Sequence, residues 1–366
     1  MTMMTTTSFI QFHQIIILFF LILTLWNSQV TMSRRLFEST CTRERHEKWM
    51  EEYGKVYKDG EEKERRFRIF KNNVEFIESF NAAGDKSFKL SVNRFADLSV
   101  EEFKASLNGL PKSHWQTTPF RHENVTDIPE TVDWRKRGVV TPIKDQGTCG
   151  CFCLFTGTHS SVTEYVLQGS WWAFSSVAAV EGIHKISTGK LVSLSVQELV
   201  DCVRGDGEGC YGGYMEDAYT FIAKNGGISS ESDYPYKQVE KPCKANEKET
   251  IHNVAKIKGF EKVPSNNEKA LLKAVAKQPV SVYLQASGYY FQFYSSGIFT
   301  GICETEPDHT ATVVGYGKDK DGTKYWIVKN SWGTDWGEKG YIRMKREVHA
   351  KEGLCGIANN VTYPII

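Results

Sequence analysis

The chain has almost no excess of charge of either sign. Its 366 residues include 45 Lys and Arg against 44 Asp and Glu, so it offers no basic field for nucleic acid and no acidic tail. Nor is it poor in hydrophobic residues, which make up 40% of the chain, and intrinsic disorder is therefore not expected. No internal repeat is present. We expect a globular protein that recognises its partners through a site rather than through its net charge.

No hydrophobic run is long enough to cross a membrane. Residues 15–26 are apolar apart from Thr24, which is the length of a signal-peptide core rather than of a membrane-spanning helix. No Lys or Arg precedes this run, the first being Arg34, and no small-residue cleavage site is evident before Ser33. We interpret residues 1–33 as a signal peptide, which directs the chain into the secretory pathway and leaves no membrane segment after its removal.

Cysteine occurs in an odd number, which excludes complete pairing. Entry into the secretory pathway makes disulfides permissible, and nine cysteines leave at least one thiol outside any disulfide within the chain. Their spacing alone does not fix the connectivity. Two triplets, beginning at Asn124 and Asn360, match the acceptor pattern for N-glycosylation. The cysteines are Cys41, Cys149, Cys151, Cys153, Cys202, Cys210, Cys243, Cys303 and Cys355.

After the signal peptide, the residue composition and periodicity of the chain change twice. Residues 42–81 carry apolar residues at steps of three to four, which predicts an amphipathic helical region. Residues 112–127 are polar and without periodicity, and we interpret them as an exposed connector that a protease could cut. A small-residue helical stretch then follows Trp172, and β-like runs bounded by glycine come later. Helices first and strands second favour an α+β body with two subdomains. The first region contains Trp49, Tyr53, Phe67, Phe70, Val74 and Ile77, and the β-like runs include residues 279–284, 310–315 and 325–329.

Three residues match parts of a thiol peptidase site. Such a site needs a thiolate, a histidine that protonates the leaving amine, a group that orients the histidine, and donors for the oxyanion. His309 comes directly before a predicted strand, Asn330 opens the sequence Asn-Ser-Trp-Gly, and Gln146 lies in Lys-Asp-Gln-Gly. Taken alone, His309 is read as structural and Asn330 as part of a turn. Their joint order and spacing favour a site.

These segments resemble the papain family of cysteine peptidases, and most closely its plant senescence-associated, vacuolar members. The resemblance covers nearly everything after the signal peptide. It implies an α+β fold with a two-subdomain body, one subdomain helical and the other β-barrel-like, preceded by a helical inhibitory propeptide. The expected domains are the propeptide at residues 34–127 and the peptidase domain at residues 128–366. The implied function is that of a cysteine endopeptidase, made as a secretory-pathway zymogen, that hydrolyses peptide bonds in protein degradation.

The propeptide region carries two segments that resemble motifs of the family. In the second, Ser91 stands where the family usually has glycine, and Asn93, Phe95 and Asp97 follow at the family spacing. The resemblance implies that the propeptide is an intramolecular inhibitor of the peptidase domain. The first motif matches at Glu62, Arg66, Phe70, Asn73, Ile77 and Asn81.

The resemblance also implies roles in the site. His309 would be the acid and base, Asn330 its orienting partner, Trp332 a shield over their hydrogen bond, and Gln146 one oxyanion donor. Gly212 and Gly213 resemble the segment that pairs with substrate backbone, although alone they would be read as a turn. The main specificity pocket would be lined by Tyr214, Met215, Tyr283 and Thr310, and it would be narrow because Tyr283 is larger than the usual aliphatic residue. The implied disulfides are Cys149–Cys210, Cys202–Cys243 and Cys303–Cys355.

The pattern breaks at the nucleophile. The family reads Cys-Gly-Ser-Cys-Trp-Ala-Phe, whereas here residues 151–169 intervene after Gly150 and the nucleophile position is Trp171. The alternative nucleophile Cys153 precedes His309 by 156 residues and Trp171 precedes it by 138, and the family spacing of roughly 130 to 150 favours position 171. The helix whose dipole would activate a thiol is also expected to start at Trp172, not near Cys153. The same two arguments count against Cys151 as the nucleophile.

Two interpretations of function remain. One is an endopeptidase that acts on peptide and protein substrates, with the insertion explained as translated intron and the tryptophan as a separate base change. The other is an inactive homologue or pseudogene product, because indole supplies no nucleophile. We also expect the insertion to displace Gln146 from the helix. Under either interpretation we expect a monomer without cofactor or metal, in a vacuole-like, lysosome-like or extracellular compartment.

Overall fold

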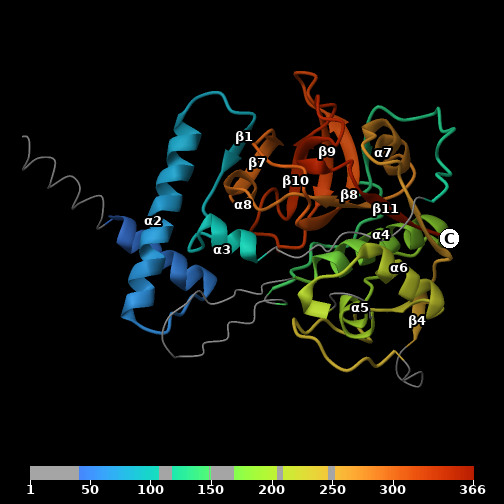
Figure 1. The fold of residues 1–366 in the computed structure, drawn as a ribbon, viewed down its shortest axis with the longest axis horizontal. Coiled ribbons are helices and arrows are strands. Elements are labelled where there is room, and N and C mark those ends of the chain that lie inside the picture. The colour runs from blue at the N-terminus through green and yellow to red at the C-terminus, as the bar shows by residue number, and fades with distance from the viewer. Residues whose placement is uncertain (1–40, 107–117, 148, 150–168, 204–208, 246–251) are drawn as a thin grey trace, which may run out of the picture. The chain divides into compact units, whose positions relative to one another are not determined.

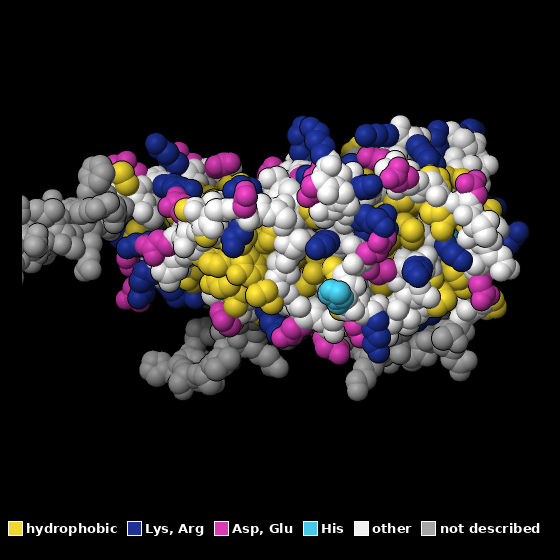
Figure 2. All heavy atoms as spheres, turned by 90° about the horizontal axis from the view of Figure 1, so that it is seen from above, with side chains coloured by type: hydrophobic (Ala, Val, Ile, Leu, Met, Phe, Trp, Pro, Cys, Tyr) yellow, Lys and Arg dark blue, Asp and Glu magenta, His cyan; other side chains and the backbone are white. Residues whose placement is uncertain are grey.

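The structure is a computed structural model that describes residues 41–106, 118–147, 149, 169–203, 209–245 and 252–366 (Figure 1). The predicted signal peptide and residues 151–168 of the predicted insertion lie outside this part of the chain. Within it, no helix is long and apolar enough to span a membrane. On the face drawn in Figure 2, cationic and anionic side chains are interspersed without a field of one sign, in keeping with the balanced composition.

The chain divides into two compact units, Met1–Asn72 and Asn73–Ile366, and the division falls inside helix α2 (Gly60–Ala82). In the first unit, residues 41–53 are helical and Gly54 follows them with a φ of 61°, a conformation that costs glycine little. Its core is aromatic: the ring of Phe70 lies 5.2 Å from that of Trp49 and 4.9 Å from that of His46. The predicted helical region is confirmed, with a break at residues 54–59.

Helices of the second unit begin and end where the local sequence provides caps. At α3, Ser99 Oγ accepts from Glu102 N at 3.2 Å and the Glu102 carboxylate accepts from Ser99 N at 3.0 Å, which is a reciprocal capping box. Helix α4 ends at Gly189 in the left-handed conformation, and it starts at Trp171, one residue before the predicted start. The helices are α3 (Val100–Ala105), α4 (Trp171–Thr188), α5 (Val196–Cys202), η1 (Gly209–Tyr211), α6 (Met215–Lys224), α7 (Glu268–Val275), α8 (Tyr289–Gln292) and η2 (Leu354–Gly356).

The strands form a nine-stranded sheet in the order β1-β7-β10-β9-β8-β6-β11-β5, with β2 paired to β8, and a separate β3–β4 pair. The predicted β-like runs are confirmed as β6, β8 and β9. In the described residues, β1 and β5 at the two ends of this order do not pair with each other, so the sheet does not close into the expected barrel. The mixture of helices and a sheet agrees with the expected α+β class. The strands are β1 (Phe88–Leu90), β2 (Val132–Asp133), β3 (Ile228–Ser229), β4 (Asn253–Ala255), β5 (Gly259–Lys262), β6 (Val280–Leu284), β7 (Tyr294–Phe299), β8 (His309–Lys318), β9 (Lys324–Lys329), β10 (Tyr341–Lys345) and β11 (Val361–Ile365).

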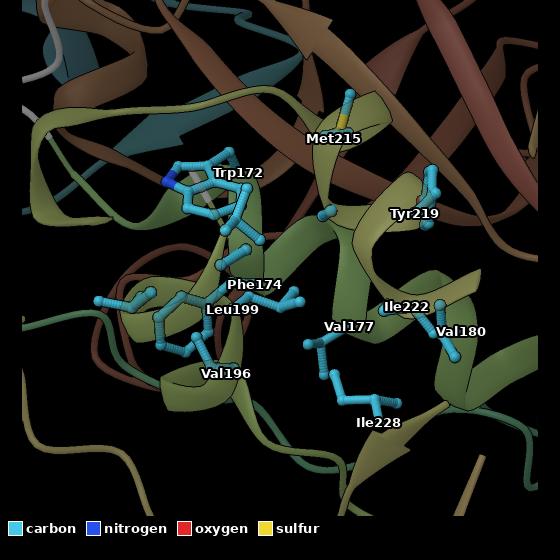
Figure 3. Packing of buried hydrophobic residues seen from close by; sticks show 14 of the residues in the cluster. Trp172, Phe174, Val177, Val180, Val196, Leu199, Met215, Tyr219, Ile222 and Ile228 are labelled. Atoms are coloured by element: carbon cyan, nitrogen blue, oxygen red, sulfur yellow. The ribbon is translucent and has the colours of Figure 1, made fainter. Parts of the chain in front are cut away.

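The core that positions the site surrounds α4, where Val177 and Val180 pack with Leu199 of α5 and Ile222 of α6 (Figure 3). These helices lie together on one side of the strands β8, β9 and β10 (Figure 1). Trp172 is fully buried in this core and donates from Nε1 to the Gly209 carbonyl at 3.2 Å. The first turn of α4 is therefore fixed against η1.

The three implied disulfides, Cys149–Cys210, Cys202–Cys243 and Cys303–Cys355, are all present. The first ties the segment after Gln146 to η1, directly before Gly212. Cys41 is an exposed free thiol, whereas Cys151 and Cys153 lie outside the described residues.

Residues 118–127 of the predicted connector contain no helix, no strand and no buried residue, as expected for an exposed connector, and their first part contacts the sheet. Arg121 Nε donates to Glu261 Oε1 at 2.8 Å, and Thr118 Oγ1 accepts from Lys262 N at 2.6 Å. Both partners belong to β5, which is the last strand of the sheet path. An edge strand leaves backbone donors without a neighbouring strand, and residues 118–121 cover part of that edge.

Candidate active site

His309 and Asn330 meet because two strands are neighbours. His309 opens β8, Asn330 directly follows β9, and β8 and β9 run antiparallel, so the start of one strand and the end of the other share an edge of the sheet. His309 Nε2 lies 2.8 Å from Asn330 Oδ1. Both residues are buried.

The surrounding backbone determines which atoms of this pair carry protons. Ser331 N donates to Asn330 Oδ1 at 2.8 Å, so that amide atom is the acceptor oxygen. His309 must then donate from Nε2, and Nδ1 of the neutral ring carries a lone pair. Burial lowers the pKa of His309 to about 4, although the bond to Asn330 acts in the opposite direction. A buried imidazole without a paired anion stays neutral.

Trp332 covers the pair from one side. Its ring centroid lies 4.8 Å from that of His309, which keeps water away from the hydrogen bond to Asn330. Phe95 and Phe103 each pack edge-on against Trp332, with centroid distances of 5.5 Å. Phe95 belongs to the second propeptide motif, so this motif contacts the side chain that shields the histidine.

Trp171, the first residue of α4, packs near His309. The two ring centroids are 6.2 Å apart with an interplanar angle of 65°, and neither side chain is exposed. Trp171 Nε1 and His309 Nδ1 are both buried, and neither makes a hydrogen bond to the described residues. The side chain at the start of this helix therefore packs near the ring of His309 and offers it no thiol.

Gln146 is held at the start of α4 by two side chains that the sequence did not indicate. Ser331 Oγ donates to Gln146 Oε1 at 2.7 Å, which identifies Nε2 as the donor atom of this amide. The Tyr236 hydroxyl donates to the Gln146 carbonyl at 2.8 Å and accepts from Ser170 Oγ at 2.7 Å. A Cβ on Gly169 would be 2.7 Å from Gln146 Nε2. The expected displacement of Gln146 is wrong, because these contacts hold it beside the helix despite the insertion.

The predicted substrate-binding residues lie next to each other. Gly212 has a φ of 103°, which suits glycine, and a Cβ on Gly213 would be 2.6 Å from the Trp172 indole. Met215 N donates to the Tyr283 hydroxyl at 3.3 Å, and Thr310 is paired with Tyr283 across β6 and β8. Tyr214, the N-cap of α6, is buried beside them.

A buried ionic cluster behind the site was not predicted from the sequence. Glu181 of α4 accepts from Lys144 Nζ at 3.0 Å and from Thr141 Oγ1 at 2.5 Å. Lys329 Nζ donates to Thr141 at 2.9 Å, and burial lowers the pKa of Lys329 to about 8. Lys329 directly precedes Asn330, so the cluster fixes the end of β9. No local pattern connects these distant positions.

The propeptide motifs are explained by contacts within each unit. In the first unit, Arg66 Nε donates to Glu62 at 2.7 Å, and hydrogen bonds from Arg65 and Arg66 lower the pKa of Glu62 to about 2. In the second, Asn73 Nδ2 donates to the carbonyl of Ala96 at 2.8 Å. Asn81 Nδ2 donates to the Leu90 carbonyl at 2.8 Å and Asn81 Oδ1 accepts from Leu90 N at 3.1 Å. Phe70 and Ile77 are buried.

The second motif also contacts the peptidase part of the second unit. Asn93 Nδ2 donates to the Gln292 carbonyl at 2.7 Å. Arg94 forms an ion pair with Asp145, the neighbour of Gln146, and lies 3.8 Å from Asp335. The second propeptide motif is thus attached directly beside the candidate site.

Comparisons with known proteins agree with this arrangement. The sequence model of the papain family cysteine proteases matches residues 128–168 and 157–365, and that of the cathepsin propeptide inhibitor domain matches residues 46–103. The papain-family match divides within the predicted insertion. Among relatives, a senescence-specific cysteine protease of Oryza sativa subsp. indica is 52% identical over 343 residues, which are 92% of this chain and 94% of the relative. A senescence-specific cysteine protease of Arabidopsis thaliana is 46% identical over 364 residues, which are 97% of this chain and 99% of the relative.

Solved proenzyme structures are similar over the same span. The recombinant stem bromelain precursor matches with a TM-score of 0.77 at 42% identity, covering 89% of this chain and 99% of that one. The proform of the Amb a 11 cysteine protease, a major ragweed pollen allergen, matches with a TM-score of 0.75 at 41% identity, covering 89% and 94%. With the fold, the propeptide inhibitor domain and the sequence all in agreement, this chain belongs to the papain family of cysteine endopeptidases.

Proposed function

We propose that this chain is a papain-type proenzyme homologue that binds peptides in its cleft but does not hydrolyse them, because Trp171 stands at the nucleophile position. The observation that carries this proposal is the 6.2 Å separation of the Trp171 and His309 ring centroids at the first residue of α4. A thiol at a helix start gains acidity from the helix dipole. An indole has no such nucleophile, and loss of the nucleophile from a comparable triad costs on the order of a millionfold in turnover.

The remaining parts of the site have assigned roles in this proposal. If a thiol stood at position 171, neutral His309 would accept its proton at Nδ1 and pass it to the leaving amine, and Asn330 would hold the ring in that tautomer. Gln146 would donate from Nε2 to an oxyanion, because Ser331 already donates to its oxygen. Trp332 would exclude water from the His309–Asn330 bond.

Peptide binding is supported by the glycine segment before α6. Gly212 and Gly213 would pair with an extended substrate backbone, and Tyr214, Met215, Tyr283 and Thr310 would form the pocket for the side chain two residues before the scissile bond. The propeptide would occupy this cleft until it is removed. Peptide and protein substrates remain the proposed partners of a monomer, without nucleic acid, and a vacuole-like or extracellular compartment of the secretory pathway remains the proposed location.

A second candidate is an active endopeptidase whose transcript lacks the insertion and encodes cysteine at position 171. The intact His309–Asn330 bond and the retained position of Gln146 favour it. Sequencing the transcript across residues 146–175 separates the two candidates. A transcript with both anomalies supports the inactive homologue, and a transcript with neither supports the endopeptidase.

The chemical test uses three forms of the chain with the propeptide removed. They are the chain as given, a form with residues 151–169 deleted, and the same deletion with Trp171→Cys. We expect hydrolysis of a fluorogenic peptide, blocked by a thiol-alkylating reagent, only in the third form. The deletion with Trp171 retained is the matched control. Alkylation-sensitive turnover by the unaltered chain would overturn the proposal, and a folded third form without activity would contradict the assigned roles.

A further inference from the structure

The phenol of Tyr283 crosses the space between the sheet and α6. Tyr283 lies on β6 opposite Thr310, the neighbour of His309, and its side chain is 2% exposed. Its hydroxyl reaches the first turn of α6, where it accepts from Met215 N at 3.3 Å and donates to Glu216 Oε2 at 2.8 Å. The ring therefore joins the strand that carries it to the helix start that follows Gly212 and Gly213.

This phenol is fixed in place by charge. Glu216 is fully buried, and its other oxygen, Oε1, lies 3.2 Å from Lys262 Nζ on β5. Swinging the ring aside would remove the Tyr283 donor from a buried carboxylate, which is unfavourable. Burial and the nearby carboxylate raise the pKa of Tyr283 well above its ordinary value, so the hydroxyl keeps the proton that it donates.

The carboxylate is not available to a basic ligand. Glu216 Oε2 already accepts from the Tyr283 hydroxyl, and Oε1, which makes no hydrogen bond in the described residues, lies 3.2 Å from the Lys262 ammonium. An incoming Lys or Arg side chain would have to displace one of these partners in a buried site. The pair would therefore close the pocket that the proposed function places here, with the carboxylate already beside a cation of the protein.

In the proposed function, this is the pocket for the side chain two residues before the scissile bond. Resting on that function, we infer that Tyr283 and Glu216 restrict the bound side chain to small ones such as Gly, Ala or Ser. Larger apolar side chains would require the fixed phenol to move, and insertion of extra atoms into a packed site is destabilising. Tyr283 is thus the residue that determines specificity, and Glu216 positions it.

The test uses the form with residues 151–169 deleted and Trp171→Cys, and peptides that differ only in having Ala, Leu or Arg at this position. We expect kcat/KM to be higher for Ala than for Leu by about tenfold or more, with Arg no better than Leu. Tyr283→Val should reverse the preference toward Leu, whereas Tyr283→Phe, which keeps the ring, should keep Ala preferred. Tyr219→Phe is the matched control, because Tyr219 also buries its hydroxyl, against Ser281, and should leave the ratio unchanged.

Preference for Leu or Arg by the form that retains Tyr283 would overturn the inference. If this form hydrolyses none of the peptides, the proposed roles fail instead, and the affinities of the Ala and Leu peptides for the Trp171 chain, measured by calorimetry with and without Tyr283→Val, then decide the inference. If Tyr283→Val does not fold, Tyr283→Val with Glu216→Gln replaces it, since this variant removes the buried charge.

Discussion

The indole of Trp171 faces the imidazole of His309 with the ring centroids 6.2 Å apart, and the nitrogens Nε1 and Nδ1 both lack hydrogen bonds to the described residues. In a working thiol site the imidazole would be stabilised as a cation by the thiolate. Here the neighbour is an uncharged indole, so burial lowers the pKa of His309 and only the hydrogen bond to Asn330 opposes it. Beside Trp171, burial keeps His309 neutral at neutral pH, and its bond to Asn330 is intact.

The first prediction concerns the dependence of stability on pH. The pKa of His309 is about 4 in the folded chain, against 6.5 for an unperturbed histidine, so the unfolded chain binds more protons between these values. The stabilisation that neutral His309 contributes to the folded chain is fully present above pH 6.5 and is lost as the pH falls to about 4. We expect a loss on the order of 3 kcal/mol in the free energy of unfolding, measured by urea titration.

The matched control for this prediction is His309→Gln, which cannot be protonated. His122 and His184 also have lowered pKa values because of burial, so only the difference between the two pH profiles reports His309. Parallel profiles from pH 7 to pH 4 would show that His309 does not titrate as the structure implies.

The second prediction concerns Asn330, whose hydrogen bond raises the pKa of His309 against the effect of burial. Asn330→Ala removes this bond and should lower the pKa of His309 further. Asn330→Asp places an opposite charge at the same site and should raise it. Titration of the imidazole by NMR measures both. Shifts in the same direction for the two variants would contradict the assigned role of the Asn330 oxygen.

Part of this site could be predicted from the sequence because short motifs fix it. His309 and Asn330 were recognised from their order and spacing, and the structure brings them into hydrogen-bond contact. The runs that became β6 and β9 were recognised from composition and bounding glycines. Such features depend on local patterns, which a single sequence carries.

The rest depends on pairs that are distant in the sequence. Tyr236 is 90 positions from Gln146, yet it links Gln146 to Ser170 across the insertion. Likewise, Glu216 has no local signal that it will receive the Tyr283 hydroxyl from a strand 67 positions away. The expected displacement of Gln146 was wrong because the contacts that Tyr236 and Ser331 make with Gln146 come from distant parts of the chain and have no local signal.

The third prediction concerns attachment of the propeptide. Arg94 forms an ion pair with Asp145, and the two side chains are 28% and 36% exposed. Pairs this exposed contribute about 0.2 to 1 kcal/mol, so Arg94→Asp should accelerate removal of the propeptide by an added protease only about two- to fivefold, as should Asp145→Arg. The combined exchange should restore most of the original rate, but not all of it, because Arg94→Asp also loses the attraction to Asp335 at 3.8 Å.

A comparable ion pair away from the propeptide serves as the control. Lys324 and Glu347 pair at 2.6 Å and are both exposed, so Lys324→Glu should leave the rate unchanged. If the exchanged double variant is cut as fast as either single variant, the Arg94–Asp145 pair does not hold the propeptide.

The fourth prediction concerns Gly213, which lies against the first turn of α4. A Cβ at this position would be 2.6 Å from the ring of Trp172, and that ring is fully buried and bonded to the Gly209 carbonyl. Gly213→Ala must therefore displace either the indole or the backbone, and we expect a loss of about 1 to 3 kcal/mol in the free energy of unfolding, measured by urea titration. Gly60→Ala is the control, since nothing lies within 4 Å of its Cβ and its φ is ordinary. Equal stability of the two variants would mean that the glycine is kept for substrate binding alone. A loss confined to Gly213→Ala would mean that packing against Trp172 already requires glycine, whether or not the site hydrolyses peptides.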